Sequence, residues 1–67
     1  MKTSDLIRER RLERSFTQQR LGEIMGYTGN CAQVTVATWE SDKSKVPRKK
    51  IKKLSELLDI PVELLIS

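Results

Sequence analysis

Residues 17–40 constrain the fold of this chain most strongly, because they predict two short helices with a break between them. Thr17 is a good N-cap for the first helix, since its hydroxyl can accept a hydrogen bond from a free backbone amide. Phe16 precedes this cap and Leu21 follows it at the spacing of a hydrophobic staple. Gly22 costs about 1 kcal/mol relative to alanine inside a helix. It indicates either the close approach of another helix or a neutral substitution.

The break and the second helix are marked by glycines and a polar residue. Gly26 and Gly29 readily adopt the backbone angles that end a helix. Asn30 is expected to cap the next helix, in which Val36 and Trp39 lie one turn apart. The stretch therefore predicts a helix, a glycine-containing turn and another helix.

The remainder of the chain predicts three more helices and no strand. The first is expected to be capped by Ser4 or Asp5 and to end near Arg14, the fourth begins around Pro47, and a short fifth lies at the C-terminal end. The apolar residues of the fourth recur at helical spacing, at Ile51, Leu54, Leu57 and Leu58. Since helix packing suits a chain of 67 residues, we predict an all-α, compact five-helix fold with one domain over residues 1–67.

The composition excludes several classes of function. The chain has no histidine and one cysteine, Cys31, so we expect neither a metal site nor an intramolecular disulfide. It also has no glycine-rich phosphate loop and no carboxylates paired for catalysis. We therefore expect no cofactor, no small-molecule substrate and no enzymatic activity. Without a signal-peptide pattern or a long apolar run, the sequence predicts a cytoplasmic protein rather than a membrane protein.

The distribution of charge points to an acidic partner. The net charge is +4, yet basic and acidic side chains are equal in number over residues 1–42. The excess lies in residues 43–53, which are rich in lysine and contain no acidic side chain. A phosphate backbone is the simplest partner for such a stretch. Two short helices around a glycine-containing turn, on a small basic chain, are typical of helix-turn-helix DNA-binding proteins.

Two blocks of the sequence match a known pattern. The first contains Phe16-Thr17-Gln18, Leu21, Gly26, Val36 and Trp39-Glu40; the second contains KSKVPR at residues 43–48 and LSELLDIPVELL at residues 54–65. Together they resemble the lambdoid phage repressor and Cro family of XRE-type helix-turn-helix proteins. The resemblance implies a five-helix, lambda-repressor-like domain that acts as a transcriptional regulator and binds a pseudo-palindromic DNA operator as a homodimer.

The helix at about residues 31–40 would then lie in the major groove. Counted back from Trp39, its outward residues are Gln33, Val34, Ala37 and Thr38. Gln33 can pair bidentately with adenine, while the methyl groups of Val34 and Thr38 can contact thymine and the Thr38 hydroxyl can donate a hydrogen bond. The alternative is that these are ordinary surface residues. Because this helix carries no lysine or arginine, positive charge must come from elsewhere.

Contacts with the DNA backbone are expected from two places. At the start of the second predicted helix, Thr17, Gln18 and the free backbone amides can meet a phosphate, and Arg20 is a further candidate. The resemblance implies this role for Gln18. It also implies sugar-phosphate contacts from the link, through Lys43, Lys45 and Arg48. The lysines that follow are weaker candidates for the same contacts, because a charged run on an amphipathic helix more often forms its solvated face; they are Lys49, Lys50, Lys52 and Lys53.

Two further features concern structure and assembly. Arg11 and Glu40 match positions that pair in some family members and join the first helix to the end of the third. The apolar C-terminal end needs cover, so we expect it to form the dimer interface through Val62, Leu64, Leu65 and Ile66. The chain departs from the family in one respect: the span from Gly26 to Trp39 is longer than usual. The extra residues fall at 27–30 and predict an enlarged turn.

Two other functions remain as alternatives. The domain could be an antitoxin-like or accessory regulator whose main partner is another protein, and the sequence does not separate this from a repressor. Residues 48–58 also form a basic amphipathic segment of the kind that binds membrane surfaces. Against membrane binding, that segment has no aromatic residue and its apolar side is the size that a domain core needs.

Overall fold

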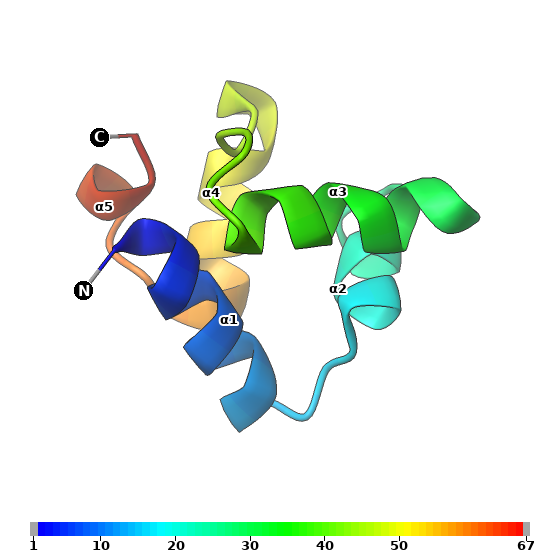
Figure 1. Cartoon of the computed structure of the whole chain (residues 1–67). Helices are drawn as coiled ribbons and strands as arrows, with labels where there is room; N and C mark the ends of the chain where they lie inside the picture. The colour runs from blue at the N-terminus through cyan, green and yellow to red at the C-terminus, as the bar shows by residue number, and fades with distance from the viewer. Residues whose placement is uncertain (1, 67) are drawn as a thin grey trace.

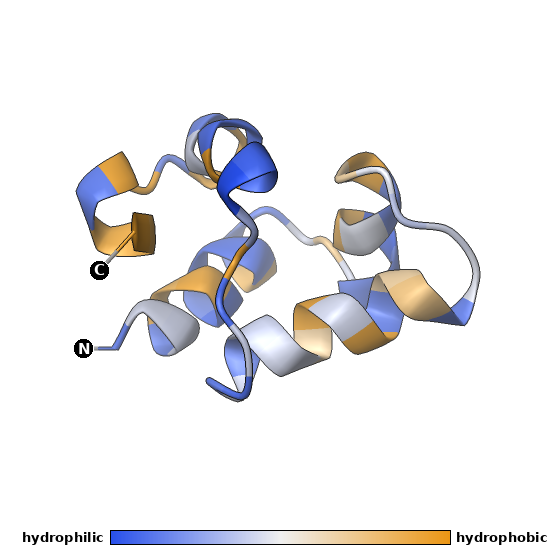
Figure 2. Ribbon diagram, turned by 90° about the horizontal axis from the view of Figure 1, so that it is seen from above, coloured by the Kyte–Doolittle hydropathy of each residue, from blue (hydrophilic) through white to orange (hydrophobic). Residues whose placement is uncertain are grey.

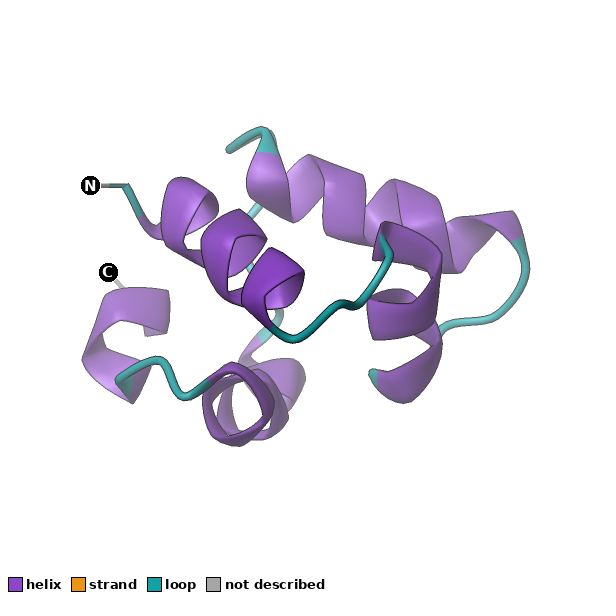
Figure 3. Ribbon diagram, turned by 90° about the horizontal axis from the view of Figure 1, so that it is seen from below, coloured by secondary structure: helices purple, strands orange, loops and turns teal. Residues whose placement is uncertain are grey.

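The computed structural model describes residues 2–66 and is built, over that range, of helices joined by short loops (Figure 3). The helices are α1 (Thr3–Glu13), α2 (Gln18–Ile24), α3 (Asn30–Glu40), α4 (Arg48–Leu58) and α5 (Val62–Ile66). The all-α, five-helix prediction is therefore confirmed for the part of the chain that the structure describes. Within the same range, every helix is too short or too polar to cross a membrane.

The helices surround one apolar core. α2 packs closely against α3, α1 contacts both α3 and α4, and α5 packs on α4 (Figure 1). The start of α1 lies beside α5, where Thr3 Oγ1 donates a hydrogen bond of 2.7 Å to the carbonyl of Leu64. The buried apolar side chains come from all five helices and from the loops, and include Ile7, Leu21, Met25, Val36, Trp39, Val46, Leu54, Leu58, Ile60 and Leu65.

Gly22 lies where α2 and α3 come closest. A Cβ atom at this position would be 2.3 Å from the backbone oxygen of Ala32, far inside contact distance. Ala32 itself is completely buried. The sequence left two explanations for this glycine open, and the structure favours the close approach of another helix.

Helices α1 to α4 each end with a residue in the left-handed conformation. At the end of α3, Lys43 N–H donates to Thr38 O (3.0 Å) and Asp42 N–H to Trp39 O (3.4 Å), the pair of bonds that defines a Schellman motif. The left-handed residues are Ser15, Gly26, Asp42 and Asp59. Of these, the sequence identified the glycine alone, because the other three rarely adopt positive φ without such a motif.

The helix starts confirm one predicted cap and contradict two. Thr17 Oγ1 accepts a hydrogen bond of 3.0 Å from Arg20 N–H, as expected. The predictions for α1 and α3 are wrong: α1 begins at Thr3 with Ser4 buried inside it, and α3 begins at Asn30 with Gly29 in the capping position. Gly29 has φ 60° and ψ −148°, angles that exclude most other residues. This backbone geometry, rather than an asparagine side chain, sets the start of α3.

Candidate nucleic-acid interface

Helix α3 separates a buried side from an exposed one. Ala32, Val36 and Trp39 are buried against the rest of the domain. Gln33 and Val34 are exposed and Ala37 is partly exposed, in the positions expected from counting back from the tryptophan. Val34 is 59% exposed, which is unusual for an aliphatic side chain and leaves its methyl groups available to a ligand.

The exposed side of α3 also includes its first turn. Asn30 and Cys31 are both exposed and were missed as candidates. Asn30 lies four residues before Val34 and seven before Ala37, so the three share one side of the helix. The sequence prediction began this helix at about residue 31 and used Asn30 as its cap. Asn30 was therefore not counted among the outward residues of the helix.

A hollow joins α3 to the start of α2. It is lined by the end of α1, by residues 15–17, and by Gln18, Gln19 and Gln33. The predicted phosphate contact Gln18 and the predicted base contact Gln33 are therefore neighbours on one surface. Both side chains line the same space, and this polar lining suits a hydrated ligand such as a DNA strand.

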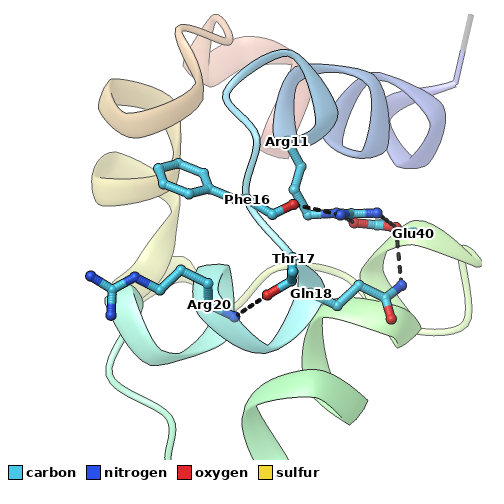
Figure 4. Close-up of polar contacts among 6 residues, drawn as sticks. All are labelled: Arg11, Phe16, Thr17, Gln18, Arg20 and Glu40. Atoms are coloured by element: carbon cyan, nitrogen blue, oxygen red, sulfur yellow. Dashed lines mark hydrogen bonds and ion pairs between the residues drawn. The ribbon is translucent and has the colours of Figure 1, made fainter.

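Behind this hollow, a buried ion pair joins α1, α2 and α3 (Figure 4). Arg11 Nε donates to Glu40 Oε2 at 2.6 Å and Arg11 Nη2 to Glu40 Oε1 at 3.2 Å, a two-bond contact. The remaining Arg11 amino group donates to Phe16 O at 2.7 Å, and Gln18 Nε2 donates to Glu40 Oε1 at 3.2 Å. The side chains of Arg11 and Glu40 are only 9% and 6% exposed. The pair implied by the resemblance is confirmed.

The residues at the start of α2 differ in what they can offer a phosphate. The Gln18 amide nitrogen is engaged with Glu40, so the free backbone amides of the first turn are the better donors here. Arg20 points away from Gln18 in Figure 4 and lies 3.8 Å from Glu23 Oε1, with its side chain 66% exposed. The structure thus keeps Thr17 and Gln18 together and places Arg20 on another side of the helix.

Thr38 holds the link between α3 and α4. Its hydroxyl donates to Thr35 O at 2.6 Å and accepts from Ser44 Oγ at 3.1 Å, while its carbonyl accepts from Lys43 N–H and Ser41 Oγ. The hydroxyl proton that was expected for a base is therefore already donated. Thr38 fixes the path of the residues that follow it, with only its methyl group left as a candidate for contact with DNA.

The basic residues of the link remain exposed. Lys43 and Lys45 are solvent-accessible, and Val46, which is 8% exposed, anchors the end of the link in the core. Arg48 is the first residue of α4 rather than part of the link, and Lys49 follows it. Positive side chains at the positive end of a helix repel its dipole, so their presence there favours an anionic partner. Figure 2 shows this end of α4 as strongly hydrophilic.

The lysines of α4 do not form one solvated face. Lys49, Lys52 and Lys53 are exposed as expected. Lys50 is half-buried, and its Nζ atom donates a hydrogen bond of 2.7 Å to Met25 O at the end of α2. The prediction of a solvated Lys50 is wrong, because the end of α2 lies within its reach.

The predicted dimer residues separate into two groups. Leu65 is 3% exposed and belongs to the core of its own domain, so its prediction as an interface residue is wrong. Val62, Leu64 and Ile66 are 41%, 42% and 60% exposed. The short helix α5 directs one side inward and the other outward, and Figure 2 shows it as a largely apolar element at one end of the molecule.

The turn between α2 and α3 is enlarged, as expected from the sequence, but by fewer residues than predicted, because Asn30 is already the first residue of α3. It spans residues 25–29, against the roughly 3–4 residues of an ordinary helix-turn-helix turn. Gln19 Nε2 donates to Gly29 O at 3.1 Å and holds the far side of the turn against α2.

Comparison with known proteins supports this arrangement. Residues 7–65 match the model of a helix-turn-helix family, and this match covers most of the chain. Separate comparisons with curated proteins and with solved structures gave no match.

Proposed function

The chain belongs to the XRE-type, Cro- and C1-like helix-turn-helix family of DNA-binding regulators, and we propose that it recognises a specific double-stranded operator as a homodimer. The single observation that carries the proposal is the exposed, uncharged side of α3 beside the start of α2, where Gln33 and Gln18 line one hollow. An α-helix fits the major groove of B-DNA, and side chains on its outer side reach the base edges.

In this proposal Gln33 and Val34 read the bases. The Gln33 amide pairs with adenine through two hydrogen bonds, and Val34 contacts thymine methyl groups, with Ala37 beside it. Because α3 has no lysine or arginine, guanine is not the expected target of this helix. Gln33→Ala should lower discrimination by about 1–3 kcal/mol at one base pair and leave the other positions of the site unchanged.

The DNA backbone is held by Lys43, Lys45 and Arg48. These side chains are exposed around the link and the positive end of α4, and they add affinity that does not depend on sequence. Lys45→Ala should weaken binding to all duplexes alike and reduce the slope of log K against log salt by about 1. An unchanged slope would remove Lys45 from the set of phosphate contacts.

The exposed side of α5 is the proposed dimer surface. It carries three exposed aliphatic side chains within one short helix, and such a cluster is best covered by a second copy. One domain measures 29 × 23 × 20 Å, a size that suits half-sites about 34 Å apart. Ile66→Lys should shift sedimentation equilibrium towards monomer and weaken operator binding.

Leu12→Lys is the matched control for the dimer. Leu12 is a comparably exposed aliphatic residue, 55% accessible, but it lies on α1. It should leave self-association in sedimentation equilibrium unchanged, and the comparison is limited to this measurement because Leu12 also lines the hollow beside Gln18 and Gln33. If both variants behave alike, the effect reflects general surface hydrophobicity and the α5 interface is incorrect.

Selection of bound duplexes from a random library tests the whole proposal. We expect an enriched motif with two-fold symmetry and A·T pairs at the positions that Gln33 and Val34 contact. Failure to enrich any sequence would contradict operator recognition. It would favour the alternative in which the domain is an antitoxin-like or accessory regulator that acts mainly through another protein.

A further inference from the structure

Lys50 differs from the other lysines of α4 in what its ammonium group contacts. Nζ lies 2.7 Å from the Met25 carbonyl oxygen and 5.2 Å from the centroid of the Tyr27 ring. Both partners belong to the end of α2 and the turn that follows it. A lysine this close to an aromatic face and a carbonyl makes a hydrogen bond and a cation–π contact at the same time.

The Met25 carbonyl is one of those left without a partner inside the helix at the C-terminal end of α2. A cation is favoured at this end of a helix, because the aligned peptide dipoles place partial negative charge there. Gly26 leaves room for it: a Cβ atom at this position would lie 3.0 Å from Lys50 Nζ. The glycine therefore permits both the turn and the approach of the lysine.

The contacts of Lys50 continue to α3 through two aromatic rings. Tyr27 packs edge-on against Trp39, with ring centroids 6.0 Å apart and an interplanar angle of 69°. Trp39 is 2% exposed and belongs to the buried side of α3. A chain of contacts thus runs from α4, through the enlarged turn, to the helix that carries Gln33 and Val34.

We propose that Lys50 is a positioning residue for DNA recognition, and that it fixes the enlarged turn so that the start of α3 meets the groove at one angle. The inference rests on the proposed function and deepens it. In this role Lys50 does not contact phosphate. Its removal reduces the discrimination between a specific site and random DNA. The salt-dependent part of the affinity falls only as much as it does when an exposed lysine of α4 is removed.

The first test uses the protein without DNA. Lys50→Met keeps most of the aliphatic stem but removes the ammonium group, Lys50→Arg retains a cation, and Lys52→Met removes an exposed charge from the same helix. We expect Lys50→Met to speed amide exchange at Gly26, Tyr27 and Ala32, whose N–H groups are bonded within and beside the turn. Amides in the middle of α1 and α4 report global unfolding. Equal loss of protection everywhere would mean that Lys50 only stabilises the fold, and would overturn the proposal.

The second test measures binding to the selected operator and to random duplex at several salt concentrations. Lys50→Met should lower the ratio of the two affinities by about tenfold, the value of one charge-assisted hydrogen bond, with a salt slope equal to that of Lys52→Met. Lys50→Arg should restore the ratio. A parallel loss of both affinities with a smaller slope would identify Lys50 as a phosphate contact and overturn the proposal. If the wild-type protein shows no sequence preference, the proposed function fails, while the exchange experiment still decides whether Lys50 fixes the turn.

Discussion

The two ends of helix α3 are held in different ways. At its C-terminal end, the Glu40 carboxylate accepts hydrogen bonds from Arg11 and Gln18, and the side chains of Arg11 and Glu40 are largely shielded from water. At its N-terminal end, Gly29 provides the cap through its backbone, and Asn30 is exposed. One end is fixed by a charged network that spans three helices, and the other by the shape of a turn.

The difference shows where DNA recognition can vary without loss of the fold. A buried ion pair sets geometry, because leaving either charge alone inside the protein is costly. A turn tolerates changes in length more readily than a buried ion pair tolerates the loss of one partner, and in this chain the turn is longer than usual. Gln33 lies near that second end, so in the proposed complex its position in the groove would depend on the turn and on the contact that Lys50 makes with Met25.

The largest loss of stability is expected at the C-terminal end of α3, which the Arg11–Glu40 pair holds. Arg11→Met leaves the Glu40 carboxylate buried with the Gln18 amide as its hydrogen-bond donor, and should lower the free energy of unfolding by about 3–5 kcal/mol. Denaturant-induced unfolding measures it. Adding Glu40→Leu should restore part of the loss, since the unpaired charge is then removed. A double variant less stable than the single variant would show that the pair itself does not determine this end of α3.

A smaller effect is expected where α2 crosses α3. Gly22→Ala places a methyl group against the backbone of Ala32, so the two helices must separate, at a cost of about 1–3 kcal/mol. Thermal and denaturant unfolding both report it. The added variant Ala32→Gly should not rescue stability, because the contact is with backbone atoms. Recovery in the double variant would mean that the side chain of Ala32 is the obstacle.

The smallest losses of stability are expected at the starts of α2 and α3, and they differ because the two helices are capped in different ways. Thr17→Ala removes an observed capping bond and should cost about 1 kcal/mol. Asn30→Ala should change stability by less than about 0.5 kcal/mol, because the backbone of Gly29 occupies the cap position of α3. The same unfolding measurements compare them. Equal losses at the two positions would contradict the assignment of Gly29 as the cap.

Much of the candidate site could be predicted from the sequence, for local reasons. Thr17 caps α2 because a hydroxyl that directly precedes a helix can accept a hydrogen bond from a free amide of the first turn. Gln33, Val34 and Trp39 fall on opposite sides of α3 because helical period alone separates them. The charge of residues 43–53 is a property of composition, so the exposure of Lys43, Lys45 and Arg48 was expected.

Other parts could not be predicted, because they depend on contacts between distant residues. Thr38 was expected to donate to a base, but the folded link brings Ser44 and Thr35 into reach of its hydroxyl. Leu65 is an aliphatic residue like its exposed neighbours Leu64 and Ile66. Only the docking of α5 on the rest of the domain decides which of the three faces inward. Lys50 belongs to a run of similar lysines, and its contact with α2 exists only in three dimensions.

Local sequence was enough to predict the helices, their order and the family, since capping, turn formation and hydrophobic period act over a few residues. Tertiary structure decided which polar groups remain available to a ligand. The reason is physical: buried hydrogen-bonding groups must find partners within the fold, so Arg11, Gln18, Thr38 and Lys50 are engaged with other parts of the protein.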